Sequence, residues 1–195
     1  MYKSLIRQQD ILPPEKLAKL AVTIIGCGAV GSFVALTLAK MGITNITVYD
    51  GDTVAAHNLP NQWYKADHIG MNKTDALWDI INDFTGVELK ANDYHYERET
   101  LRGIVICCVD SMDTRLNIWR EVKKFNPELY IDARMGAEVG KVLVPDVKSF
   151  SQLTTIRSAV VRGTITSSKH TSISRGRKSP TDEGALAPGI IADAA

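Results

Sequence analysis

Residues 21–31 read Ala21-Val-Thr-Ile-Ile-Gly26-Cys-Gly28-Ala-Val-Gly31. The first five form a short apolar run, which is typical of a strand buried on both faces. Three glycines follow with the spacing GxGxxG, and the apolar residues of 30–41 then recur at helical spacing. In a strand–loop–helix unit, glycines allow close backbone approach, and free N–H groups at the helix start attract phosphate. We therefore predict a nucleotide-binding loop formed by Gly26, Gly28 and Gly31.

The flanking sequence alternates between strand-like and helix-like segments. Apolar runs predict further strands over residues 43–49, 103–109, 129–131 and 141–144, the third of them ending at Asp132. Helical spacing predicts helices over 72–84 and 111–125, and directs Leu77, Ile80, Ile81 and Phe84 of the first one inward. Alternating strands and helices favour parallel pairing with right-handed crossovers. The predicted fold class is α/β, with a doubly wound, mainly parallel, Rossmann-like sheet and helices on both faces.

Composition limits the classes of partner and the compartment. The 195 residues are 45% hydrophobic and 23% charged, with a formal net charge of +1. A neutral chain favours neither nucleic acid nor a membrane surface as partner. Three cysteines cannot form a disulfide framework, and no stretch reaches the length of about 18 apolar residues needed to span a membrane. We expect a cytoplasmic protein.

The composition changes after residue 150. The last 45 residues contain 13 Ser or Thr and no aromatic residue, whereas the first 150 residues contain the same number of Ser and Thr. Such a segment has little apolar periodicity with which to build a core. We predict one nucleotide-binding domain over residues 1–150 and a mobile or incomplete C-terminal segment over 151–195.

Polar residues after the predicted strands indicate the kind of nucleotide. Asp50 lies 19 residues after Gly31, at the end of the next strand, where an acid hydrogen-bonds a ribose hydroxyl. This much fits NAD or FAD as well as ATP, so a dinucleotide-dependent oxidoreductase is one alternative. Asn58, Gln62 and Lys73 follow, and they suit phosphate chemistry better than hydride transfer because a cation neutralises phosphate charge. Asp110, which ends a later strand, could hold Mg²⁺ through its oxygens.

Together these motifs resemble the ThiF/MoeB/HesA group of ubiquitin-activating-type adenylyltransferases over about residues 5–146. The resemblance is carried by Arg7-Gln8, the glycine loop, Asp50-Gly-Asp52, Asn58…Gln62, Ile69-Gly70…Lys73 and Asp110…Thr114-Arg115. It implies that the C-terminal carboxylate of a ubiquitin-like or sulfur-carrier protein attacks the α-phosphate of MgATP, giving an acyl-adenylate and pyrophosphate.

The resemblance also assigns roles to residues of this chain. The glycine loop would approach the phosphates and Asp50 would bind the ribose. Asn58, Gln62 and Lys73 would line the triphosphate, and Asp110 would hold Mg²⁺. Arg7 would reach the ATP of a partner subunit, which makes a homodimer the expected active unit. Arg7, Lys73 and Asp110 would carry catalysis.

Two departures from the family pattern leave a further alternative. Asn61 stands where the family usually has Arg, and the chain has neither paired CxxC motifs nor a cysteine after Cys108. The chain could therefore be a catalytically dead scaffold that binds a carrier. Structural roles also compete at single positions: a turn for Asp52, packing for Cys27, and either a site wall or an anchor for Trp63-Tyr64.

Overall fold

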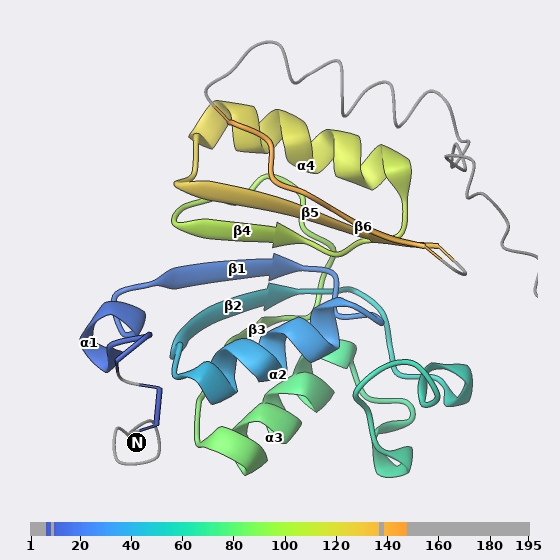
Figure 1. Cartoon of the computed structure of the whole chain (residues 1–195). Coiled ribbons are helices and arrows are strands. Elements are labelled where there is room, and N and C mark those ends of the chain that lie inside the picture. Colours follow the sequence, from blue (N-terminus) through green and yellow to red (C-terminus); the bar gives the residue numbers. More distant parts are fainter. Residues whose placement is uncertain (1–6, 9, 137–138, 148–195) are drawn as a thin grey trace, which may run out of the picture. The chain divides into compact units, whose positions relative to one another are not determined.

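The computed structural model describes residues 7–8, 10–136 and 139–147. They contain a six-stranded sheet with the strand order β3-β2-β1-β4-β5-β6 (Figure 1). The strands are β1 Ala21–Ile25, β2 Asn45–Tyr49, β3 Lys90–Asn92, β4 Ile104–Cys107, β5 Leu129–Met135 and β6 Gly140–Leu143. All neighbours are parallel except β5 and β6, which are antiparallel. The predicted α/β class with a mainly parallel sheet is confirmed, whereas residues 151–195 lie outside the described residues.

Helices cover both faces of the sheet. They are α1 Pro14–Leu17, α2 Gly31–Met41, α3 Lys73–Thr85 and α4 Met112–Phe125, with the short 3₁₀ helices η2 Ala56–Asn58 and η3 Ala66–His68. Helices α2 and α3 pack on one side of the sheet and α4 lies on the other (Figure 1). None of the helices in the described ranges is long and apolar enough to cross a membrane.

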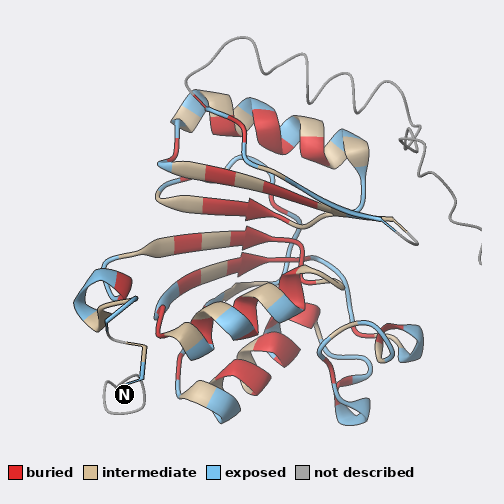
Figure 2. Ribbon diagram, viewed as in Figure 1, coloured by how far each residue is buried: buried red, intermediate tan, exposed pale blue. Residues whose placement is uncertain are grey.

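Each face has its own core, and the inner strands are buried between them (Figure 2). The α2/α3 side buries Ile24, Val48, Leu77, Ile80 and Ile81, among others. The α4 side buries Val105, Ile118, Trp119, Val122 and Tyr130. The predicted inward residues of α3 are thus confirmed except for Phe84. Phe84 is 54% exposed near the end of that helix, where the Lys40 ammonium lies 4.5 Å from its ring centroid.

The prediction that a strand ends at Asp132 is wrong. β5 continues through this residue to Met135, and Asp132 is fully buried. Its carboxylate accepts hydrogen bonds from the guanidinium groups of Arg115 and Arg134, the latter through Nε at 2.8 Å. Because two cations neutralise the carboxylate, β5 can contain a buried acidic residue in its middle.

Candidate functional site

The glycine loop joins β1 to α2 at the carboxyl end of the sheet. Gly26 has a φ of +95°, and a Cβ there would stand 2.9 Å from the backbone of Cys108 and Val109. A Cβ on Gly31 would stand 1.8 Å from the carbonyl oxygen of Gly26. These two glycines are required by the packing of the turn itself, as the GxGxxG context predicts.

Gly28 is different, because its outer face is open. Apart from the adjacent loop residues, the one described atom within 4 Å of a Cβ there would be Nε2 of Gln62, at 4.0 Å, and the φ of Gly28 lies outside the left-handed region. The other amide atom, Gln62 Oε1, is buried and has no hydrogen-bond partner among the described residues. A buried polar group without a partner is costly. An open loop face is what a phosphate-binding loop requires, and Nε2 of Gln62 is the amide atom that could donate to a phosphate there, because Oε1 is itself an acceptor.

Asp50 lies at the end of β2, where the sequence predicts it. It is buried, and its two carboxylate oxygens accept hydrogen bonds from the backbone N–H of Cys27 at 2.7 Å and of Asp52 at 2.9 Å. The carboxylate therefore braces the glycine loop against the strand end. Each carboxylate oxygen has capacity for a further donor, so the predicted ribose contact is compatible with this bracing.

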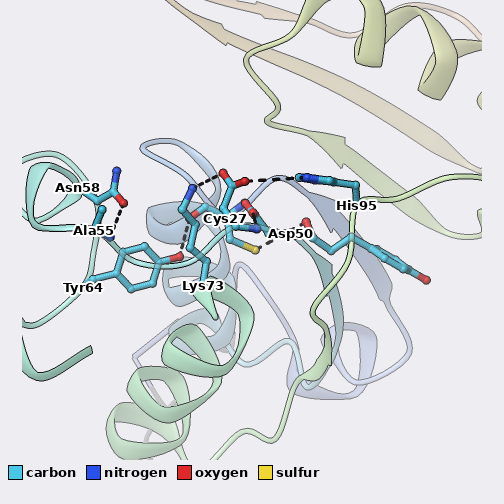
Figure 3. A network of polar contacts seen from close by, with 9 residues as sticks. Cys27, Asp50, Ala55, Asn58, Tyr64, Lys73 and His95 are labelled. Carbon is cyan, nitrogen blue, oxygen red and sulfur yellow. Dashed lines mark hydrogen bonds and ion pairs between the residues drawn. The ribbon is translucent and has the colours of Figure 1, made fainter. Parts of the chain in front are cut away.

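Lys73, the first residue of α3, is directed to this edge by an ion pair that the sequence did not predict. Its Nζ lies 2.7 Å from Oδ2 of Asp52, although the lysine side chain is only 9% exposed. The hydrogen bond and the charge of Lys73 lower the pKa of Asp52, with burial acting in the opposite direction. Nε2 of His95 lies 4.0 Å from the other carboxylate oxygen (Figure 3). Asp52 thus links the predicted phosphate-binding lysine to an exposed imidazole.

The segment after β2 is fastened to the loop by polar contacts. Asn58 is buried, and its Oδ1 accepts a hydrogen bond from the backbone N–H of Ala55 at 2.9 Å. The hydroxyl of Tyr64 donates to the carbonyl oxygen of Cys27 at 2.6 Å (Figure 3). Tyr64 is therefore an anchor of the glycine loop. Burial raises the pKa of the Cys27 thiol well above its usual value, so this cysteine packs rather than reacts.

Asp110 follows β4 at the same edge of the sheet and is exposed. The backbone next to it is fixed, because the buried guanidinium of Arg115 donates to the carbonyl oxygen of Val109 as well as to Asp132. Arg115 thereby ties the end of β4 to α4 and β5. The described residues contain no group of three or more His, Cys, Asp or Glu that could hold a metal ion. Asp110 would accordingly supply one carboxylate to Mg²⁺, with other ligands from phosphate oxygens and water.

Arg7 lies away from these residues. Its neighbour Gln8 donates from Nε2 to the carbonyl oxygen of Met41 at 2.6 Å, at the last residue of α2. The glycine loop is at the other end of this 11-residue helix, about 16 Å away. The structure therefore brings together the glycine loop, Asp50, Gln62 and Lys73, while Arg7 stands at the opposite end of α2.

Comparisons with known proteins agree with the fold. The model of the ThiF family matches residues 4–130. The ubiquitin-like modifier-activating enzyme 5 of Oryza sativa subsp. japonica is 26% identical over 125 residues, covering 52% of this chain and 29% of that protein. The adenylyltransferase and sulfurtransferase MOCS3-1 of Zea mays is 27% identical over 132 residues, covering 63% of this chain and 28% of that protein.

Among solved structures, the E. coli tRNA N6-threonylcarbamoyladenosine dehydratase TcdA matches with a TM-score of 0.61 and 19% identity, over 70% of this chain and 62% of that one. At this identity the likeness shows the fold alone. The chain spans less than a third of the length of the curated relatives above, at 29% and 28%.

Proposed function

The chain belongs to the ThiF family, and from this premise we propose that it uses ATP to adenylate the C-terminal carboxylate of a ubiquitin-like or sulfur-carrier protein. The observation that carries the proposal is the open face of Gly28. Beyond the adjacent loop residues, Gln62 is the one described residue beside that face, which lies on the same edge of the sheet as Lys73 and Asp50. The distant relatives with adenylyltransferase and modifier-activating names support the reaction class.

In the proposed reaction, a carboxylate oxygen of the carrier attacks the α-phosphorus of ATP. The new P–O bond forms as the bond between the α-phosphorus and the bridging oxygen breaks, so that pyrophosphate leaves with the electron pair. The nucleophile is already anionic, so no side chain needs to take a proton. Positioning and neutralisation of charge supply the acceleration.

Different residues of this chain would position the substrates and neutralise their charge. The backbone N–H groups of the glycine loop would receive the phosphates, and the Lys73 ammonium would offset their charge beside Asn58 and Gln62. Asp110 would hold Mg²⁺, which supplies Lewis-acid polarisation of the phosphates when bound. Asp50 would hold the ribose while bracing the loop.

The predicted homodimer fits the position of Arg7. Because Arg7 stands at the far end of α2 from its own glycine loop, it would act on the nucleotide of a second copy. The active unit we propose is therefore a homodimer in which each copy completes the site of the other.

The test is exchange of radioactive pyrophosphate into ATP, with Mg²⁺ and a panel of small carrier proteins ending in Gly-Gly. We expect exchange that requires a carrier and disappears in Asp110→Ala. The matched control is Asp113→Ala, which removes an exposed acid from the first turn of α4 and should leave exchange unchanged.

Asn61 gives the second candidate function a specific basis. It is exposed beside the site where the family usually carries a cation, so the scaffold alternative predicts ATP binding without exchange. Exchange with any carrier excludes a dead scaffold. Tight ATP binding with no exchange across the whole panel contradicts the adenylation proposal and favours the scaffold.

A further inference from the structure

His95 occupies an unusual place next to the acids that follow β2. It comes three residues after the end of β3, and its ring lies beside Gly51, next to the position that a Cβ would take. A Cβ on Gly51 would stand 3.0 Å from both Cδ2 and Nε2 of the ring. The absence of a side chain at Gly51 thus makes room for the imidazole, whose side chain is nonetheless 75% exposed.

The imidazole and the carboxylate of Asp52 face each other across a gap. Nε2 and Oδ1 are 4.0 Å apart, and the carboxylate is 56% exposed. This is too long for a direct hydrogen bond, because such bonds have donor–acceptor distances of about 2.7–3.2 Å. One hydroxyl oxygen can lie about 2.8 Å from both atoms, since the two distances together exceed the gap.

The chemistry of the pair suits a hydroxyl group. A hydroxyl donates one hydrogen bond and accepts others, the carboxylate only accepts, and the ring N–H donates. A hydroxyl between them would donate to Oδ1 of Asp52 and accept from Nε2–H of His95. The other oxygen of Asp52 is already taken by Lys73 at 2.7 Å, so the carboxylate is held in place.

The location fits a ribose. Asp50, Gly51 and Asp52 form the turn at the end of β2, which in this fold is where a nucleotide ribose meets an acid. The carboxylate of Asp50 is buried and braces the glycine loop, whereas the side chain of Asp52 in that turn and that of His95 beside it are exposed.

We propose that His95, together with Asp52, contacts a ribose hydroxyl of the nucleotide and makes the site selective for ribonucleotides. The inference rests on the proposed ATP site and adds a specificity-determining residue to it. The group recognised would be a sugar hydroxyl of a nucleoside triphosphate.

The test is calorimetric titration of the full chain with the magnesium complexes of ATP, 2′-deoxy-ATP and 3′-deoxy-ATP. We expect the wild type to bind one deoxy analogue more than fivefold more weakly than ATP, because that analogue loses the hydrogen bonds to both Asp52 and His95, each with a value of about fivefold. His95→Ala should weaken ATP binding by about fivefold and leave that analogue unchanged, so the selectivity falls by that factor and the remainder is carried by Asp52. His57→Ala is the matched control, because it removes another exposed imidazole, on η2, and should retain the wild-type selectivity.

Each remaining outcome contradicts the inference. Equal binding of all three nucleotides by the wild type shows that no hydroxyl is recognised. A His95→Ala variant that keeps the wild-type selectivity, or that weakens all three nucleotides equally, shows that His95 does not contact the hydroxyl. A wild type that binds none of the three refutes the proposed ATP site itself, which is a separate failure.

Discussion

Gly28→Ala should weaken the binding of MgATP and at the same time stabilise the folded protein. Among the described residues not adjacent to it, the new methyl group would meet Nε2 of Gln62 alone, at 4.0 Å, and the backbone of Gly28 is outside the left-handed region. The fold therefore accepts alanine, and the reduced freedom of the unfolded chain should stabilise the protein by about 0.4–1 kcal/mol. The same methyl covers the open face of the loop. Forcing a ligand past an added methyl costs about 1–3 kcal/mol, so MgATP should bind about 5- to 150-fold more weakly.

The assay combines thermal unfolding of the ligand-free protein with calorimetric titration of MgATP. Gly28→Ala should raise the melting temperature by about 1–4 °C and lower the affinity for MgATP. Gly31→Ala is the contrasting variant, because its methyl would stand 1.8 Å from the Gly26 carbonyl oxygen and must displace the backbone. It should lower the melting temperature. If Gly28→Ala binds MgATP as the wild type does, the open face is not where the phosphates bind.

Four further substitutions test the charged groups. Lys73→Met should weaken ATP binding by at least about tenfold in calorimetry and leave adenosine binding unchanged, because only ATP carries phosphates; equal losses for both would contradict a phosphate contact. Asp52 has a lowered pKa, so the stabilisation it provides is present above about pH 4 and lost as the pH falls further. Accordingly, the unfolding free energies of wild type and Asp52→Asn should converge below about pH 4, and a constant difference would count against the ion pair. Asp132→Asn should destabilise the protein by roughly 3–5 kcal/mol in urea unfolding, because it leaves Arg115 buried without its carboxylate. Asp83→Asn, which removes an exposed ion pair, should cost less than about 1 kcal/mol.

The strong periodic signals of the sequence predict most of the fold. β1 is found at the predicted residues 21–25, and α2, α3 and α4 begin within one residue of the predicted helices. β3 was missed because it consists of three residues, Lys-Ala-Asn, at the edge of the sheet. An edge strand this short is held by backbone pairing with β2 and needs no apolar run. Local sequence alone therefore gives no signal for it.

For the candidate site too, local sequence predicts some features and not others. Glycine spacing identifies the loop, because the required φ and the close contacts are local properties of the chain. The ion pair between Asp52 and Lys73 joins residues 21 positions apart, and His95 comes from a third segment. No spacing rule connects these residues; only the parallel sheet brings the ends of β2 and β3 and the start of α3 to one edge. The buried pair of Arg115 and Asp132 was missed for the same reason.

The positions of the cations bear on how the site could work. Lys73 is the one cation among the predicted residues that gather at this edge, and it already shares its charge with Asp52. Asn61 adds no charge, and Arg7 stands at the other end of α2. A triphosphate carries several negative charges, and their neutralisation is the main task in adenylyl transfer. The predicted site residues of one copy, within the part of the chain that the structure describes, therefore supply little positive charge for the proposed reaction. The deficit would be met by Mg²⁺ on Asp110 and by Arg7 of a second copy, so we expect activity to depend on magnesium and on dimerisation together.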